Sequence, residues 1–230
     1  MANSKRDDFD GTETFTAGYV MGDFDIGPKF SLIGGMRYEH YNMNYDANFI
    51  YVTHAVDGDC KIFNDETNLN TVNRNDDDFF PNAQLRYKFA DWGDVRAAYT
   101  KSIIRPDYRA IIPNTFYVPG SGSLSGNTKL KPTISDNLDF NISVYKNKIG
   151  LFTLGGFYKK MQDVFFQTSI FYQNLSFYNI SFPDSSVWTE LGFEKNQWPQ
   201  KSDRITAYLN NPDPAYVKGL EFEWQTNFWY

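Results

Sequence analysis

The feature that most constrains this chain is a strict alternation of apolar and polar side chains. In "NLDFNISVY" (137–145), Leu138, Phe140, Ile142 and Val144 alternate with polar residues without a miss. This pattern predicts a β-strand with one apolar and one polar face, because successive side chains of a strand point to opposite sides. The apolar face must meet either the core of a soluble sandwich or the lipid around a barrel.

Alternation of this kind recurs along the chain, whereas the 3.6-residue spacing of apolar helical residues is nearly absent. No run of about 18 apolar residues occurs, so a membrane-spanning helix is excluded, although alternating strands could still span a bilayer. The expected fold class is therefore all-β. The pattern predicts about seven strands, over 12–24, 29–45, 79–90, 94–105, 134–146, 149–166 and 215–229.

The connections between these strands are alternately short and long. An antiparallel up-and-down meander produces this order when all short turns lie at one end and all long loops at the other. Transmembrane β-barrels have such an asymmetry, with short periplasmic turns and long extracellular loops. A soluble sandwich has no reason to alternate its loops. The short turns are 25–29, 90–94 and 145–150, and the long loops are 46–78, 106–133 and 167–214.

Aromatic residues are 18% of the chain, and many lie at strand ends beside the short turns. Amphipathic rings favour the headgroup layer of a membrane, so a row of them at one level is typical of an interfacial girdle. Ordinary cross-strand packing is the alternative explanation. Together with the loop alternation, the row favours a membrane barrel over a soluble sandwich. The residues are Phe24, Phe30, Phe89, Trp92, Tyr145, Phe152, Phe228 and Trp229.

Charge and cysteine content exclude other classes. The net charge of −6 argues against a nucleic-acid partner. The single cysteine, Cys60, excludes an internal disulfide framework. The start, "MANSKRDDFDG", has no apolar segment typical of a secretory signal, so an exported protein would be a mature form or a fragment.

Two stretches carry a resemblance to a known family. "RAAYTKSIIRPDYRAIIP" (96–113) and "SGNTKLKPTISDNLDFNISVY" (125–145) resemble a segment of TonB-dependent receptors of the outer membrane. In that family, a strand runs into Arg-Pro and an outer loop, and the chain returns through Gly-Asn-x-x-Leu-Lys-Pro. The loops are similar to those of Bacteroidota-type receptors. Here the returning pattern is occupied by Gly126, Asn127, Leu130, Lys131 and Pro132.

The resemblance implies a location in the bacterial outer membrane and the active uptake of a scarce nutrient, such as a siderophore or a glycan. Family members have a larger barrel, filled by a plug domain through which the TonB complex acts, and some have a surface lipoprotein partner. Seven strands cannot close such a barrel. We therefore expect residues 1–230 to be part of the barrel domain, in contact with outer-membrane lipid, with the plug domain and the closing strands absent.

In such a barrel, ligands are expected at the outer loops and in the lumen. Arg and Tyr side chains suit polar ligands through charge-assisted hydrogen bonds or ring stacking. The alternative roles are loop folding and charge pairing between strands. The ligand-contact candidates are Arg105, Asp107, Tyr108, Arg109 and Tyr117. The lumenal lining candidates are Arg37, Glu39, Arg86, Lys88, Arg96, Glu221 and Glu223.

No metal, cofactor or catalytic site is expected. The acidic stretches 57–60 and 73–78 lack the pattern of a calcium-binding loop, so solvated acidic loops are favoured. His40 and His54 have no second ligand at a suitable spacing. The leading hypothesis is a segment of a TonB-dependent transporter without enzyme activity. The alternatives are a soluble β-sandwich that binds carbohydrate and, less favoured, a passive outer-membrane channel.

Overall fold

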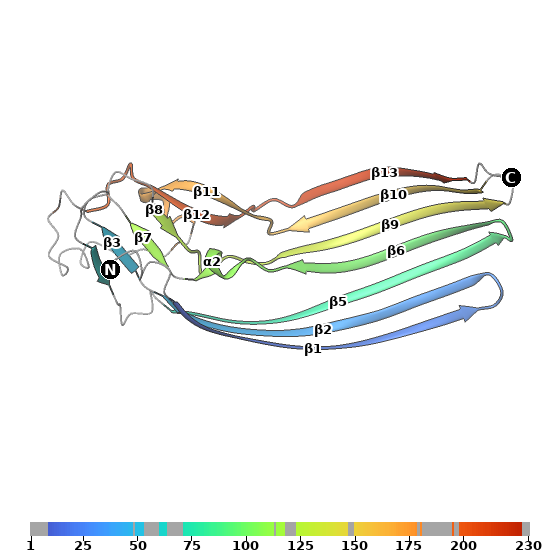
Figure 1. Ribbon diagram of the computed structural model, residues 1–230, viewed down its shortest axis with the longest axis horizontal. Coiled ribbons are helices and arrows are strands. Elements are labelled where there is room, and N and C mark those ends of the chain that lie inside the picture. Colours follow the sequence, from blue (N-terminus) through green and yellow to red (C-terminus); the bar gives the residue numbers. More distant parts are fainter. Residues whose placement is uncertain are drawn as a thin grey trace.

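The computed structural model describes residues 9–47, 49–52, 60–63, 71–112, 114–117, 123–146, 150–178, 180, 195 and 198–226. Most of them lie in one long sheet of seven strands, which makes up most of the length of the molecule (Figure 1). Among the described residues, no helix is long and apolar enough to cross a membrane.

The long sheet is an antiparallel meander, as the sequence predicts. Its spatial order follows the chain, so each strand pairs with the next long strand in sequence. The short turns gather at one end, here called the turn end, and the long loops gather at the other, the loop end (Figure 1). The strands are β1 (Phe9–Ile26), β2 (Phe30–Ala47), β5 (Thr71–Ala90), β6 (Gly93–Ile104), β9 (Thr133–Lys146), β10 (Gly150–Gln162) and β13 (Ala215–Gln225).

The register divides the side chains into two faces that continue across all seven strands. Leu32 pairs with Leu85, which pairs with Ala97 and, through it, with Phe140. Directly paired residues of an antiparallel ladder share a face, so these apolar residues form a common apolar face. The alternate residues form the polar face. The register also assigns the faces of β1, because its Phe24 pairs with Leu32 of the apolar face.

The predicted C-terminal boundary of the loop 46–78 is wrong. Strand β5 begins at Thr71 instead of residue 79, so the acidic stretch 73–78 is a strand and not a solvated loop. Its carboxylates have partners on the neighbouring strands: Asp78 bonds Arg105, and Asp77 bonds Tyr38 and His40. A run of acidic residues did not indicate a loop here, because partners on neighbouring strands bind the carboxylates. The other acidic stretch, 57–60, lies outside the described residues except for Cys60, which begins β4 (Cys60–Phe63).

The predicted long loops also contain strands of their own. Six short strands form a second sheet at the loop end, in the order β11-β12-β8-β7-β3-β4 (Figure 1). The predicted strand 149–166 is divided by Asp163, which lies between β10 and β11 with a φ of 53°. The remaining strands are β3 (Phe49–Val52), β7 (Thr115–Tyr117), β8 (Ser123–Ser125), β11 (Phe165–Phe171) and β12 (Arg204–Asn210).

A hydrophobic cluster joins the loop 106–133 to the polar face of the long sheet. Near the loop end this face becomes apolar, through Tyr41, Met43 and Tyr45 of β2. The short helix α2 (Tyr108–Ile111) and Leu130 pack on these residues. The loop therefore turns back over the polar face.

Candidate functional site

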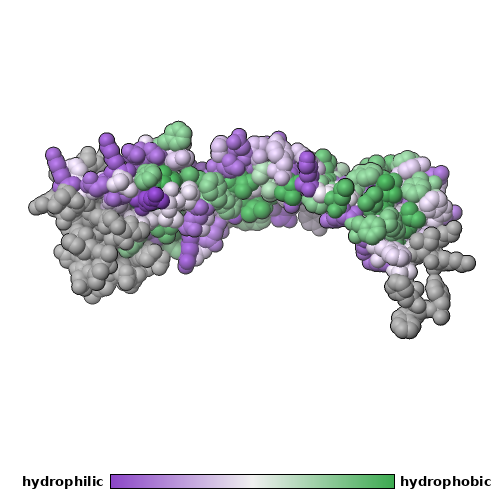
Figure 2. All heavy atoms as spheres, turned by 90° about the horizontal axis from the view of Figure 1, so that it is seen from above, coloured by the Kyte–Doolittle hydropathy of each residue, from purple (hydrophilic) through white to green (hydrophobic). Residues whose placement is uncertain are grey.

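The apolar face of the long sheet is exposed and is not a buried core. Leu220 is 85% exposed, Phe222 65%, Leu138 52% and Phe140 49%. A soluble sandwich would bury these residues between two sheets, so the sandwich alternative is not supported by the described part of the chain. A row of large apolar side chains left exposed in this way is typical of a surface that contacts lipid. Hydrophobic residues gather over the middle and the turn end, and hydrophilic ones over the loop end (Figure 2).

Two rows of aromatic residues bound this apolar face. The row at the turn end contains Phe24, Phe30, Tyr87, Phe89, Phe152 and Trp224, and the row towards the loop end contains Tyr38, Phe79, Tyr99, Tyr158 and Tyr216. Phe30 and Tyr38 are eight positions apart on β2, which is about 26 Å along a strand at roughly 3.3 Å per residue. A tilt of about 40° reduces this to about 20 Å, close to the apolar band of a membrane barrel.

The predicted girdle at the short turns is only partly correct. Phe24, Phe30 and Phe152 lie on the apolar face. Tyr145 does not, because its register partner is Leu151 on the polar face. Trp92 lies in the turn before β6 and packs edge-to-face on Phe89, with ring centroids 5.5 Å apart. Phe228 and Trp229 lie outside the described residues.

All seven lumenal lining candidates lie on the polar face. The register pairs Arg86 with Arg96 and Lys88 with Asp94, and it places Arg37 and Glu39 on the same side of β2. Glu221 and Glu223 share this face on β13, opposite Gly155 and Thr153. Within the described residues, Lys88, Glu221 and Glu223 form no ion pair, whereas the other four candidates do. Their role as the lining of a lumen stays a prediction.

Asp94 organises the polar face at the turn end. Its side chain is fully buried, and its Oδ2 accepts hydrogen bonds from Nε of Arg86 at 2.8 Å and from Nη2 of the same residue. Nε of Arg96 lies 3.1 Å from its Oδ1. Because Arg86 and Arg96 are direct register partners, the one carboxylate bridges two guanidinium groups and offsets part of their mutual repulsion.

Arg105 organises the polar face nearer the loop end. Its Nη1 lies 3.0 Å from Glu39, and its Nη2 lies 2.9 Å from Asp78. Its guanidinium also lies over the rings of Tyr41 and Phe15, at 5.0 and 5.6 Å from the centroids. Glu39 in turn accepts a hydrogen bond from Arg37 at 2.6 Å. The start of the loop 106–133 is thus tied to β2 and β5.

The returning Gly-Asn-x-x-Leu-Lys-Pro stretch fixes the other end of this loop. A Cβ on Gly126 would lie 1.8 Å from the carbonyl oxygen of Ile112, so only glycine fits. The buried Asn127 donates from Nδ2 to the carbonyl of Tyr208 at 2.9 Å, and its Oδ1 accepts from the amide of Lys129 at 3.0 Å. Leu130 is fully buried, and its carbonyl accepts from Nη1 of Arg74 at 2.6 Å.

The five ligand-contact candidates occupy different environments. Arg105 is engaged in the ion pairs above. Tyr117 is 0% exposed, and its hydroxyl donates to Asp203. Asp107 and Arg109 are exposed at the start of α2, where Asp107 accepts a hydrogen bond from the amide of Arg109 at 2.9 Å. The Arg109 guanidinium lies 5.9 Å from the ring centroid of Tyr108. The five therefore divide into Arg105 and Tyr117, which are held away from the start of α2, and a trio at the start of α2, whose Tyr108 packs on the ring of Phe9 with centroids 5.1 Å apart.

Two tyrosines of β2, beyond the aromatic row at the loop end, share one carboxylate. Tyr41 and Tyr45 donate to Oε1 of Glu13 at 2.9 and 2.6 Å. Burial and this bond raise the pKa of Tyr41 to about 12, and the same causes raise the pKa of Tyr45. Among the described residues, no cluster of His, Cys, Asp or Glu could hold a metal ion.

The sequence reasoning missed Asp94, Asp78 and Arg74 as organising residues. The sequence places Asp94 where the short turn 90–94 meets the predicted strand 94–105, and Asp78 at the end of an acidic loop, with no partner predicted for either. An available signal was the two-residue spacing of opposite charges in "DVR" (94–96) and "RND" (74–76), which places both charges of each pair on one face of a strand.

Comparisons with known proteins agree with this geometry. The family "TonB dependent receptor-like, beta-barrel" matches residues 2–230. None of the curated proteins compared with the chain matches it. The Bacteroidota-type origin stays a prediction.

Solved receptors share the fold. A double mutant of the hemophore receptor HasR of Serratia marcescens, in complex with its hemophore HasA and heme, has a TM-score of 0.61 at 13% identity over 92% of this chain and 31% of its own. The copper transporter OprC has a TM-score of 0.58 at 15% identity, over 95% and 28%. A mutant of the ferric enterobactin receptor of Pseudomonas aeruginosa has 0.52 at 14%, over 95% and 33%.

The chain thus spans about a third of the length of these receptors. The family match covers nearly all of it, the long sheet has the two faces of a barrel wall, and its loops gather at one end. The chain therefore belongs to the β-barrel family of the TonB-dependent receptors of the bacterial outer membrane.

Proposed function

We propose that this chain forms part of the barrel wall of a transporter that takes up a scarce nutrient with energy supplied through TonB. The observation that carries the proposal is the two-faced sheet whose outer loop, 106–133, turns back over the polar face. In such an arrangement lipid meets one face, and the ligand meets the loops above the other. In this proposal the plug domain and the strands that close the barrel belong to other parts of the protein.

Within this proposal, the five ligand-contact candidates have two roles. Arg105 and Tyr117 position the loop, because the first is held by two carboxylates and the second is buried against β12 with its hydroxyl on Asp203. Asp107, Tyr108 and Arg109 present a carboxylate, a ring and a guanidinium at the start of α2. These groups suit a polar ligand with aromatic or anionic parts.

The substrate class is proposed from receptors of similar fold. They are a hemophore receptor in complex with its hemophore and heme, a copper transporter and a ferric enterobactin receptor. A metal chelate or heme is therefore the first class to test, and a glycan is the second. The lumenal candidates Arg37, Glu39, Arg86, Lys88, Arg96, Glu221 and Glu223 would line the path or contact the plug.

The experiment is growth on a single nutrient source in the bacterium that encodes the receptor. A strain without the receptor gene is supplied with heme, with ferric enterobactin, with a cupric salt or with a glycan as the carbon source. It is complemented with the wild-type gene or with the Asp107→Asn/Arg109→Gln variant. Asparagine still caps α2, so the loop should fold. We expect the deletion to abolish growth on one source and the variant to restore it poorly.

The matched control is Lys131→Gln/Asp163→Asn, which removes the same two charges from a loop-end pair 3.9 Å apart. It should restore growth as the wild type does, with equal amounts of receptor in the outer-membrane fraction. If the deletion strain grows normally on every metal and glycan source supplied, the transport proposal is wrong.

A further inference from the structure

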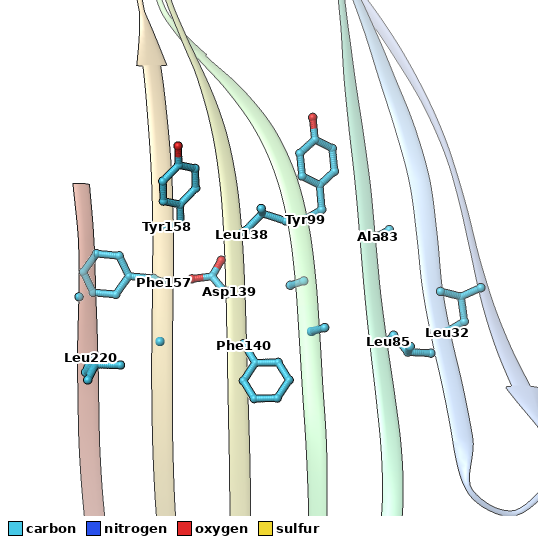
Figure 3. Close-up of a pocket in the computed structure, with 14 residues that line it drawn as sticks. Leu32, Ala83, Leu85, Tyr99, Leu138, Asp139, Phe140, Phe157, Tyr158 and Leu220 are labelled. Carbon is cyan, nitrogen blue, oxygen red and sulfur yellow. The ribbon is translucent and has the colours of Figure 1, made fainter. Parts of the chain in front are cut away.

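A hollow lies on each face of the long sheet. The hollow of the apolar face measures about 640 Å³, and large apolar side chains such as Leu85, Leu138 and Phe140 surround it (Figure 3). It belongs to the surface that contacts lipid. The second hollow, of about 290 Å³, is lined mainly by residues of the polar face of β1, β2, β5 and β6. Its apolar lining sets it apart from the charged side chains that dominate this face.

The second hollow exists because β2 has a glycine between two neighbours that have side chains. Gly35 pairs with Met21 of β1 and with Asn82 of β5, so a space stays open between these two side chains. A Cβ on Gly35 would lie 2.7 Å from the carbonyl oxygen of Val20, which disfavours any larger residue. The hollow is therefore built into the backbone of the sheet. Its apolar lining includes Tyr19, Met21, Ile33 and Phe80, and its polar lining includes Arg37, Asn82 and Thr100.

Strand β1 presents apolar side chains on the polar face. Its register with β2 places Phe9, Phe15, Tyr19 and Met21 on this face, and these four residues are here called the β1 track. Phe15 is 50% exposed, Tyr19 78% and Met21 67%. Large apolar side chains that are left exposed along one line indicate a contact surface, because burying them against a partner is favourable.

The β1 track begins at the candidate ligand-contact trio, because the ring of Phe9 packs on Tyr108 of this trio. From Phe9 to Met21 the strand advances about 40 Å, at roughly 3.3 Å per residue, and reaches the second hollow. Gly35 lies between the two aromatic rows on β2, so the hollow is at the depth of the apolar band on the other face. The track thus connects the trio at the loop end with a hollow at membrane depth.

The second hollow suits one aromatic ring with polar substituents. The ring of Tyr19 and the thioether of Met21 favour contact with another ring. Arg37 and its polar neighbours can bond hydroxyl or carboxylate groups at the edge of that ring. The side chain of Arg37 is 46% exposed and bonds Glu39 through Nε, so its terminal nitrogens remain available within the described residues. A volume of about 290 Å³ is at the lower end of ligand sites, so a single ring fits and a porphyrin does not.

We propose that the β1 track guides a nutrient whose aryl group carries hydroxyl or carboxylate substituents, and that the second hollow holds this group on its way through the lumen. The inference rests on the proposed transport function and adds a site below the loop-end trio. Gly11, Glu13 and Ala17 separate the rings of the track on the same face. The track therefore offers successive ring contacts and lacks the contiguous apolar patch that a docked plug domain would bury.

The test separates binding at the outer surface from uptake by the whole receptor. Cells that produce the receptor are supplied with radioactive iron as ferric enterobactin or as the ferric complex of 2,3-dihydroxybenzoate, both of which carry catechol rings. Iron bound by de-energised cells reports on the loop-end site, and iron accumulated by energised cells reports on uptake. We expect Tyr19→Ala/Met21→Ala to slow uptake on the order of tenfold and to change binding less than about twofold, because the lost ring contacts lie below the loop-end site.

Two further variants separate the chemistry of the track from the space in the hollow. Tyr19→Phe/Met21→Leu keeps a ring and an apolar contact and should recover most of the uptake that the alanine variant loses. Asn82→Phe fills the hollow from β5 and should slow uptake as strongly as the alanine variant. The matched control is Phe157→Ala/Met161→Ala, which removes a ring and a methionine from the polar face of β10 and should leave uptake unchanged.

Each result decides for or against the proposal. Wild-type uptake by the alanine variant or by Asn82→Phe, or an equal loss in the matched control, would show that the hollow does not hold the nutrient. Increased entry of vancomycin into cells with the alanine variant, together with slower uptake of every nutrient, would show that the track holds the plug instead. If deletion of the receptor gene abolishes growth only on heme, copper or a glycan, the track proposal is wrong although the transport proposal stands. Heat-dependent mobility on a gel confirms that each variant is a folded barrel before uptake is measured.

Discussion

Asp94 provides the sharpest test of how this barrel wall is held together. Its fully buried carboxylate bonds Arg86 and contacts Arg96, and these two arginines are register partners. Asp94→Asn keeps the size of the side chain but removes the negative charge. The two guanidinium groups then face each other without a counter-charge.

The expected loss of stability depends on how far the side chains of Arg86 and Arg96 are exposed to water. Removing one partner of a fully buried ion pair costs about 3–5 kcal/mol. Here the side chains of Arg86 and Arg96 are 36% and 54% exposed, so water recovers part of their solvation. We therefore expect a local loss of about 2–3 kcal/mol, which includes about 0.2–1 kcal/mol from like charges directly opposite each other.

The assay is native-state hydrogen exchange of the β5–β6 hairpin in the receptor held in lipid nanodiscs. A loss of about 2–3 kcal/mol corresponds to exchange about 30- to 150-fold faster. Arg96→Gln alone should accelerate exchange less than about fivefold, because Arg86 still bonds Asp94. The Asp94→Asn/Arg96→Gln variant should exchange more slowly than Asp94→Asn, because it also removes the repulsion between the two guanidinium groups.

Lys88→Gln is the matched control, because Lys88 is the register partner of Asp94 but forms no ion pair among the described residues. It should leave the exchange rate nearly unchanged. If Asp94→Asn exchanges as the wild type does, or if the Asp94→Asn/Arg96→Gln variant is the least protected of all, the bridging of two arginines by one carboxylate is wrong.

Three further predictions concern the loop end. Gly126→Ala places a methyl group 1.8 Å from a backbone carbonyl and should destabilise the loop 106–133 by about 3 kcal/mol, measured by limited proteolysis, whereas Gly18→Ala, with no atom within 4 Å, should have no effect. Arg105→Gln removes two ion pairs and should accelerate hydrogen exchange in the same loop about tenfold, in line with about 1.5 kcal/mol for a partly exposed charged pair; unchanged exchange would contradict its role. Tyr41 holds its proton more tightly when folded, so thermal stability should fall as the pH rises from 10 towards about 12, and Tyr41→Phe should reduce this dependence.

Much of the fold could be predicted because alternation is a local property. Whichever strands become neighbours, Leu138 and Phe140 must share one face, and Arg86 and Lys88 must share one face. The seven long strands, their order and the common face of the charged residues follow from this pattern and from the alternation of short and long connections.

Only the tertiary structure decided which partners meet on those faces. The charge of "NRNDDD" (73–78) indicates a loop, but Arg105 and Tyr38, brought close by the register, make it a strand. Tyr117 resembles a ligand-binding residue in the sequence, but it is buried against β12, and its hydroxyl bonds Asp203, 86 residues later in the chain. The reason is that a side chain's face depends on its own strand, whereas its partners depend on the register of segments far away in the sequence.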